Sequence, residues 1–478
     1  MMPNLEEKLV SDWINDLFKR QQAHLPTLRK EPVSTRKAHL KRLKQWVLSH
    51  RPMIQRAVYA DFKKPAAEVD GTEIFPVLDE IAHALANLDR WTKPKKVDAP
   101  ITMLGTRSLI VAEPKGVCLI IAPWNYPFNL CVGPLVSALA AGNSVIIKPS
   151  EATANTSALI KKMCDDLFED RVVAVCEGGL EVSQHLLKLP FDHIFFTGSP
   201  AIGKVVMKAA AENLTSVTLE LGGKSPTLVT PSANLKDAAR RIAVTKFINN
   251  GQTCIAPDYV LVHESIKDKL IDRLKEEVKA LFQEGEKPLE QSPHYARIVN
   301  EKHFARLSNM LEELVEKGAQ LHLGGRVDAA DQFIHPVIVS DIPAGAQIME
   351  EEIFGPLLPI LTYKNLNDAI RLINSKPKPL ALYIFGSDSR EREQVLQETS
   401  AGTVCINDCA IQFLHHNIPF GGVNNSGIGK SHGYFGFLAF SNEKPVLRQR
   451  SGITSVSPLY PPYTGGVKRI MDWLLKFI

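Results

Sequence analysis

The fold is decided by an uncharged stretch early in the chain. Residues 116–147 read GVCLIIAPWNYPFNLCVGPLVSALAAGNSVII and contain no Asp, Glu, Lys, Arg or His. A helix needs about 20 apolar residues to cross a membrane, so length alone permits a span. Pro123, Pro127 and Pro134, with two asparagines among them, would leave polar groups unpaired in lipid. We therefore interpret the stretch as a buried strand, a loop, a helix and a second strand.

The same alternation of strand and helix continues through the chain, after about a hundred helical residues whose third helix is expected at 71–91. The first set of strands is expected at 117–121, 144–147, 172–176, 193–196 and 216–219, with helices near 129–141, 153–169, 181–188 and 200–212. The second set is expected near 226–230, 258–263, 336–339, 357–362 and 380–386, with long helices such as 265–284 and 298–317. Alternation of this kind indicates parallel strands with right-handed crossovers, so we predict an α/β fold of two domains.

Composition excludes several classes of protein. The 478 residues are 45% apolar and 23% charged, which argues against disorder. The net charge of +4 is too small to make nucleic acid the expected partner. Seven cysteines without a CxxC motif indicate reduced thiols and a cytoplasmic location. The pair His415-His416 near Cys405 and Cys409 has no zinc-ligand spacing, so we expect no metal.

Cys254 is the first candidate for chemistry. It ends the turn Asn250-Gly251-Gln252-Thr253-Cys254, directly before a predicted strand, where nucleophiles are often displayed. A free thiol with a pKa of about 8.5 is only a few per cent thiolate at neutral pH. Local backbone N–H groups or the positive end of a cofactor could raise that fraction.

Glu220 is the second candidate, because its carboxylate lies between two leucines at the end of an apolar strand. Desolvation there would raise its pKa towards that of a useful general base. The alternative is an ion pair with Lys224 across the glycine turn that separates them. The residues alone leave both interpretations open.

Three further segments leave strands at their carboxyl ends, where ligands gather in open α/β sheets. Asn125 follows one strand and could donate its amide N–H to a developing oxyanion, or simply stabilise a loop between two prolines. The run 196–203 reads FTGSPAIG and leads into a helix, which suits a pyrophosphate although it is not GxGxxG. Lys148-Pro149-Ser150-Glu151 adds a cation and a carboxylate suited to ribose hydroxyls.

Together these segments resemble the aldehyde dehydrogenase superfamily over about residues 15–450. The matching motifs are Glu220-Leu221-Gly222-Gly223-Lys224-Ser225-Pro226, Gly251-Gln252-Thr253-Cys254, Pro123-Trp124-Asn125, Phe196-Thr197-Gly198-Ser199, Glu351-Glu352-Ile353-Phe354-Gly355-Pro356 and Pro419-Phe420-Gly421-Gly422. The Ile-Ala-Pro-Asp-Tyr run after Cys254 is most similar to the class 3 branch, which acts on fatty and aromatic aldehydes. Asn424 stands where that branch commonly has glycine, and this difference bears on the expected shape of the substrate entrance.

The resemblance implies a domain organisation and a reaction. A Rossmann-like NAD-binding domain would comprise 1–96 and 115–222, an α/β catalytic domain 223–436, a small β oligomerisation arm 97–114 and 437–450, and a tail 451–478. The reaction would be NAD(P)-dependent oxidation of a medium- or long-chain aliphatic or aromatic aldehyde to the carboxylic acid, through a cysteine thiohemiacetal and thioester. A CoA-acylating or phosphorylating relative is the alternative.

The resemblance also assigns roles to residues. Cys254 would attack the aldehyde, Asn125 and the Cys254 N–H would hold the oxyanion, and Glu220 would activate water. The cofactor would contact Trp124, Lys148, Glu151, Gly198, Ser199, Gly203, Leu221, Glu352 and Phe354. NAD is the expected cofactor, with NADP also accepted, because Glu151 is placed to meet the adenosine ribose 2′-hydroxyl. A homodimer without a membrane span is expected, although the tail could touch a membrane surface.

Overall fold

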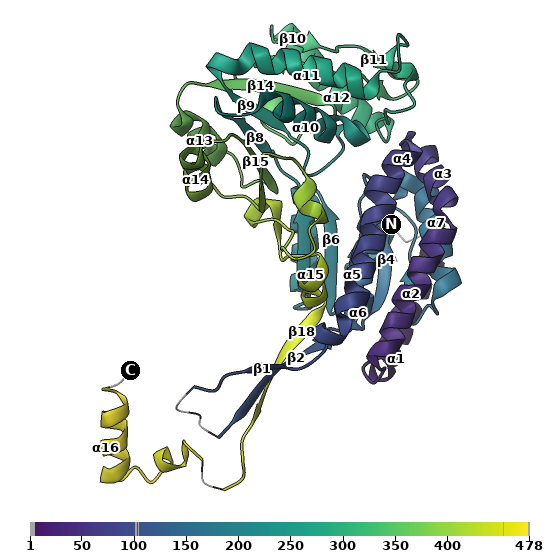
Figure 1. Cartoon of the computed structure of the whole chain (residues 1–478). Helices are drawn as coiled ribbons and strands as arrows, with labels where there is room; N and C mark the ends of the chain where they lie inside the picture. The colour runs from purple at the N-terminus through teal and green to yellow at the C-terminus, as the bar shows by residue number, and fades with distance from the viewer. Residues whose placement is uncertain (1–4, 101–102, 104, 453, 477–478) are drawn as a thin grey trace.

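The computed structural model describes residues 5–100, 103, 105–452 and 454–476, so the predicted domain limits at 1 and 478 lie outside the described residues. Residues 5–91 form a helical layer beside the first sheet (Figure 1). This layer contains α1 (Leu5–Leu28), α2 (Val33–Ser49), α3 (Arg51–Phe62), α4 (Ala66–Val69), the π-turn η1 (Asp70–Ile74) and α5 (Phe75–Trp91). The predicted third helix is confirmed as α5, and its first turn is π-helical instead of α-helical. Residues such as Val77, Ile81 and Leu88 pack the buried side of α5 into the core.

The first sheet has six strands in the order β17-β7-β6-β3-β4-β5. Five run parallel at the predicted positions: β3 (Val117–Ile121), β4 (Ser144–Lys148), β5 (Val173–Val175), β6 (His193–Gly198) and β7 (Ser216–Leu221). They alternate with α6 (Asn129–Ala141), α7 (Ala154–Leu167), α8 (Leu180–Leu186) and α9 (Pro200–Ala211). The uncharged stretch is therefore a buried β3–α6–β4 unit, and its strands are apolar because both faces of the sheet are covered.

The second sheet has seven strands and lies above the first in Figure 1. The strands in order are β10 (Gln320–Leu323), β13 (Val337–Ser340), β14 (Leu357–Tyr363), β9 (Tyr259–His263), β8 (Pro226–Val229), β15 (Ala381–Phe385) and β16 (Thr403–Ile406). All neighbours are parallel except the edge strand β10. The helices are α10 (Leu235–Phe247), α11 (Lys267–Phe282), α12 (Glu301–Glu316), α13 (Leu366–Ser375) and α14 (Ser389–Glu398).

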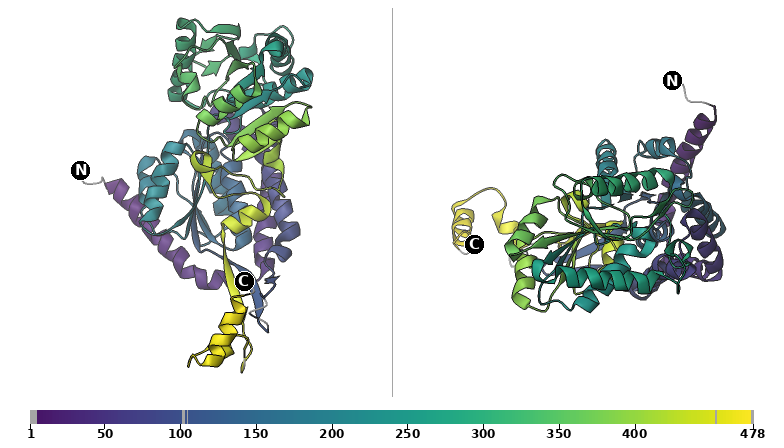
Figure 2. Two further views of the ribbon diagram at one scale, coloured as in Figure 1. Left: turned by 90° about the vertical axis from the view of Figure 1, so that its left-hand side faces the viewer. Right: turned by 90° about the horizontal axis from the view of Figure 1, so that it is seen from above.

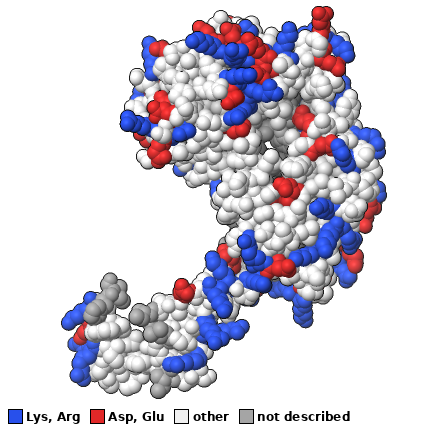
Figure 3. Space-filling model, viewed as in Figure 1, with Lys and Arg blue, Asp and Glu red and all other residues white. Residues whose placement is uncertain are grey.

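A three-stranded antiparallel sheet extends from the body as an arm (Figures 1 and 2). It consists of β1 (Lys95–Val97), β2 (Arg107–Pro114) and β18 (Ser441–Arg448), and the tail beyond it ends in α16 (Gly465–Leu474). Lysine and arginine side chains gather over the arm and tail in Figure 3. No helix in the described ranges is long and apolar enough to cross a membrane.

A short strand near residue 427 joins the first sheet. Strand β17 (Gly427–Ile428) lies within the range 223–436 predicted for the second unit, yet it pairs antiparallel with β7 of the first sheet. The reason is that β7 would otherwise be an edge strand with unpaired backbone groups. Gly427 is the register partner of Glu220, so this segment passes directly beside a predicted catalytic residue.

Candidate active site

A cavity of about 420 Å³ lies where β3, β6 and β7 end and the loop before β9 begins. Most of the predicted site residues line it together: Trp124, Asn125, Gly198, Ser199, Glu220, Cys254, Glu352 and Phe354. These residues are spread over more than two hundred positions of the chain, so the tertiary fold brings them together. The lining does not include the other four predicted residues, Lys148, Glu151, Gly203 and Leu221.

The loop that presents Cys254 has an unusual backbone. Asn249 and Asn250 both have φ of 53°, and Gly251 has φ of 72°, so three consecutive residues are left-handed. Asparagine tolerates this region better than most residues, and glycine adopts it without steric cost. A Cβ at Gly251 would also approach the Gly355 carbonyl oxygen to 2.3 Å. The Asn-Asn-Gly run thus allows the sharp turn that ends at Cys254.

Side-chain amides hold this loop in place. The Gln252 amide donates to the carbonyl oxygens of Asn249 at 2.9 Å and Arg297 at 3.0 Å, and its own oxygen accepts from the Val299 N–H at 3.0 Å. The Asn249 amide donates to the Asn125 carbonyl at 2.8 Å. Since these groups are buried, their loss would leave unpaired polar atoms, and the loop is fixed by several bonds at once.

The environment of Cys254 favours the neutral thiol. Its side chain is partly buried, and burial, with the nearby Glu352 and Glu220 carboxylates, raises the pKa of the thiol above its usual range. Backbone N–H groups of Cys254 and Ile255 act in the opposite direction with smaller effect. The local N–H groups therefore act in the predicted direction, but desolvation outweighs them and the net shift of the thiol pKa is upward. The other six cysteines are buried.

Asn125 forms hydrogen bonds with the Cys254 loop and with the helical layer. Its side-chain amide donates to the Gln252 carbonyl oxygen at 3.0 Å, and its own backbone carbonyl accepts from the buried Lys64 ammonium at 3.3 Å. The amide nitrogen has two N–H donors, and the bond to Gln252 uses one of them. Asn125 thus stabilises the loop and also lines the cavity with Cys254, so its two sequence interpretations are compatible.

Glu220 is only 6% exposed at the end of β7. Burial raises the pKa of its carboxyl to about 7, while the hydrogen bond donated by the Ser431 hydroxyl opposes this shift. The alternative ion pair with Lys224 is wrong, because Lys224 pairs with Asp258 and donates to two backbone carbonyls. A carboxyl with a pKa near 7 is half ionised at neutral pH and suits a general base.

A second carboxyl, that of the half-buried Glu352, also lines the cavity. Burial and the Asp258 charge raise its pKa to about 8. A Cβ at Gly222 would lie 2.1 Å from a Glu352 carboxylate oxygen, so only glycine permits this approach. Phe354 follows in the same loop, and its ring meets Trp124 edge-to-face at 5.3 Å.

The remaining residues form a cradle that fits a dinucleotide. The Ser199 hydroxyl caps α9 by accepting from the Ile202 N–H, and this helix N-terminus opens into the cavity. A Cβ at Gly203 would approach Leu221 to 2.7 Å, so glycine lets α9 pack closely on β7. The Lys148 ammonium, at the end of β4, lies 3.1 Å from Glu151. Anion-binding N–H groups and this ion pair suit a pyrophosphate and a ribose respectively.

Two residues that line the cavity were not predicted from the sequence. His303 and Arg306 lie on α12, and the His303 ring packs on Trp124 at 4.8 Å. His303 Nδ1 and Arg306 Nη1 are buried without a hydrogen-bond partner among the described residues, which fits a polar ligand in the cavity. Their i, i+3 spacing on a predicted helix was an available signal. Within the same described ranges, no cluster of His, Cys, Asp and Glu could hold a metal ion.

Comparisons with known proteins agree over nearly the whole chain. The profile of a family described as "Aldehyde dehydrogenase family" matches residues 10–446. The 4,4'-diaponeurosporen-aldehyde dehydrogenase of Staphylococcus aureus is 44% identical, over 96% of this chain and 98% of that protein. Aldehyde dehydrogenase family 3 member A2 of Pongo abelii is 41% identical, over 93% and 90%. A solved structure of Staphylococcus aureus AldH in a substrate-bound state has a TM-score of 0.92 and 43% identity, over 96% and 99%.

Proposed function

The chain belongs to the aldehyde dehydrogenase family, and on that basis we propose that Cys254 is the nucleophile of its reaction. The protein is an NAD(P)-dependent oxidoreductase that converts an aldehyde to the carboxylic acid. The observation that supports the proposal for Cys254 is that its thiol, the Asn125 amide and the Glu220 carboxyl line one cavity.

The first half of the reaction is the covalent step. The Cys254 thiol first loses its proton to solvent; the thiolate sulfur then forms a bond to the aldehyde carbon, and the carbonyl oxygen becomes an oxyanion that accepts from the Asn125 amide and from the Cys254 backbone N–H. NAD(P), when bound, supplies the hydride acceptor. Loss of hydride leaves the acyl group on Cys254 as a thioester.

The second half is hydrolysis of that thioester. The Glu220 carboxylate takes a proton from water while the water oxygen bonds to the acyl carbon. The carbon–sulfur bond then breaks, and the thiolate leaves with the carboxylic acid as product. A Glu220 pKa of about 7 suits this role, because the carboxylate is both available and basic enough to accept a proton.

Binding of the cofactor would use both sides of the cleft. Lys148 and Glu352 would bind ribose hydroxyls, Ser199 and Gly198 would lie by the pyrophosphate, and Phe354 would pack near the nicotinamide ribose. Trp124, Gly203 and Leu221 would shape the walls. We propose NAD as the preferred cofactor with NADP also accepted, because the Glu151 carboxylate would accept from a 2′-hydroxyl and repel a 2′-phosphate.

The substrate we propose is a medium- or long-chain aliphatic aldehyde or an aromatic one. The Staphylococcus aureus relative is named for diaponeurosporen-aldehyde, and a class 3 relative is among the similar proteins. The test is NADH formation from straight-chain alkanals of increasing length and from benzaldehydes, compared by specificity constant without CoA or phosphate. Activity that required CoA or phosphate would favour the acylating or phosphorylating alternative, for which the comparisons gave no support.

We also propose a cytoplasmic homodimer assembled through the arm. Strand β18 is an outer strand of the arm and is largely exposed, so its free edge is available for pairing with another chain. Light scattering of the purified protein tests the assembly, and a monomer at working concentration would contradict it.

A further inference from the structure

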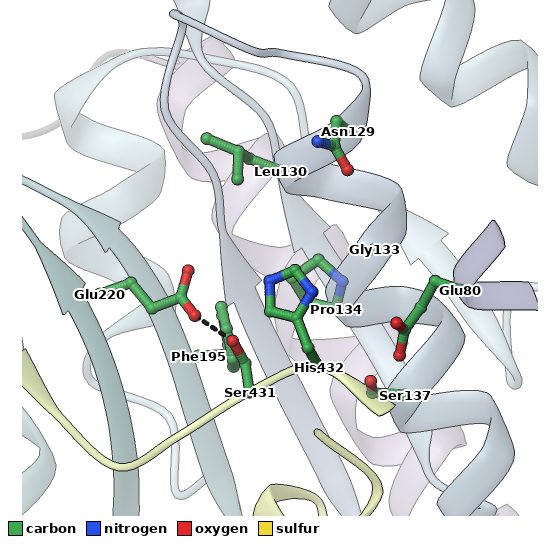
Figure 4. A pocket seen from close by; sticks show the side chains of 10 residues that line it. All are labelled: Glu80, Asn129, Leu130, Gly133, Pro134, Ser137, Phe195, Glu220, Ser431 and His432. Atoms are coloured by element: carbon green, nitrogen blue, oxygen red, sulfur yellow. Dashed lines mark hydrogen bonds between the residues drawn. The ribbon is translucent and has the colours of Figure 1, made fainter. Parts of the chain in front are cut away.

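A second, much smaller cavity adjoins Glu220 (Figure 4). Its volume is about 30 Å³, which gives room for at least one water molecule. Its polar lining comes from Glu220, Ser431, His432, Glu80, Asn129 and Ser137. Figure 4 shows the Ser431 hydroxyl at the Glu220 carboxylate and the His432 ring between that pair and Glu80. Two buried carboxyl groups therefore face one cavity from opposite sides.

From Glu80 the polar contacts continue outward. One Glu80 carboxylate oxygen accepts from the Gly433 N–H at 2.8 Å, and the other lies 3.1 Å from His416 Nδ1. His416 Nε2 lies 2.6 Å from an Asp79 carboxylate oxygen. The side-chain exposure rises along this series, from 7% at Glu80 to 15% at His416 and 39% at Asp79. The contacts thus lead from the interior to solvent.

The pKa shifts along the series indicate which groups hold a proton at rest. Burial acts to raise the pKa of Glu80, but the hydrogen bond from His416 and neighbouring groups outweigh it, and the net shift is downward. The hydrogen bond to Glu80 raises the pKa of His416 to about 9, so His416 is protonated at neutral pH. Burial lowers the pKa of His432, whose neutral ring has one donor and one acceptor nitrogen.

Other charged groups border the series without bridging it. The His83 ring stacks on His416 with 4.9 Å between centroids, and Arg90 lies near His83. At the inner end, Lys430 lies near Glu220 and donates to the Gly421 carbonyl at 2.6 Å. Residues of α5, of the loop before β17 and of the segment after it therefore all contribute charge around the path.

We propose that this series of side chains carries to solvent the proton that Glu220 takes from water, a role that rests on the proposed function of Glu220. Each hydrolysis leaves one proton on a buried carboxyl, which must lose it before the next turnover. The proton passes to a water in the small cavity, then by way of His432 to Glu80, while His416 releases one to Asp79 and solvent. Every group gains one proton and loses one, so the cycle ends with the charges unchanged.

The test compares Glu80→Gln and His416→Gln with the unaltered protein by rapid mixing. Neither residue lines the cavity that contains Cys254, so we expect both to act only through Glu220. We expect an unchanged rate for the first equivalent of NADH and a steady-state rate lower by about tenfold in dilute buffer. Rising concentrations of imidazole should restore most of that rate, because a small base can carry the proton instead. His83→Gln, beside the path, is the matched control and should show neither effect.

Three outcomes would overturn the relay. These are a slowed first equivalent of NADH, a lower steady-state rate that imidazole does not restore, or unchanged kinetics in both variants. The variant at half-buried His416 keeps the test valid if Glu80→Gln does not fold. Glu220→Gln, measured in parallel, separates the two claims. If it accumulates acyl-enzyme while the relay variants behave as the unaltered protein, only the relay is wrong. If it turns over normally, the role of Glu220 is wrong.

Discussion

Replacing Ser431 with alanine should raise the pKa of Glu220 and move the pH dependence of thioester hydrolysis. The Ser431 hydroxyl donates to the Glu220 carboxylate and stabilises its charged form, so its loss favours the protonated form. A hydrogen bond to a charged group contributes about 1.5–3 kcal/mol. One pKa unit corresponds to about 1.4 kcal/mol, so the shift should be about one to two units.

The effect on rate follows from the ionised fraction. A carboxyl with a pKa of about 7 is half ionised at pH 7. Raising that pKa by about one to two units leaves about 10% to 1% ionised, so hydrolysis at pH 7 should slow about 5- to 50-fold. The rate should recover as pH rises through the new pKa, because the base form is then restored.

The assay is single-turnover hydrolysis of the acyl-enzyme across neutral and alkaline pH. Ser441→Ala is the matched control, because this buried serine donates to the Phe437 carbonyl at 2.7 Å instead of to Glu220. Its pH profile should match that of the unaltered protein. A Ser431→Ala profile with an unshifted midpoint would refute the claim that this hydroxyl sets the pKa of Glu220.

Three further predictions concern the rest of the site. Cys254→Ser should abolish oxidation and retain cofactor affinity, because a serine hydroxyl has no comparably strong base; turnover near that of the unaltered protein would contradict this. Asn125→Ala should slow the first equivalent of NADH by about 100- to 1000-fold at saturating aldehyde, and a loss below about threefold would leave it only a structural role. Glu151→Gln should raise the specificity constant for NADP relative to NAD, since it removes the charge that repels a 2′-phosphate; an unchanged ratio would argue against contact with the ribose.

Sequence patterns predicted the interior of the fold well, because buried parallel strands are continuous apolar runs. The strand 117–121 and the helix 129–141 match the structure at both ends. The strand β10 (Gln320–Leu323) was missed because it is an edge strand without buried residues, so its sequence has no apolar run. The pairing of β17 with β7 was missed because a two-residue strand carries no periodicity.

In the site, too, residues with a local sequence signal could be predicted, whereas contacts between distant positions could not. Residues at strand ends, such as Asn125 and Glu220, carry a local signal, and both line the cavity. Ser431 bonds to Glu220 across 211 positions, and Glu80 meets His416 across 336, so no local pattern could pair them. Local N–H groups lower the pKa of the Cys254 thiol, as its sequence position indicates, but burial and two carboxylates raise it by more, and both of these depend on tertiary packing.

The most direct test of the central claim is mass spectrometry of Glu220→Gln after mixing with aldehyde and NAD. The account predicts one burst of NADH approaching one per active site, little further turnover, and an acyl group on Cys254 that hydroxylamine removes. A slowed burst without accumulated acyl-enzyme would contradict the assignment and make Glu352 the better candidate for the base. Unchanged steady-state kinetics would contradict any catalytic role for Glu220.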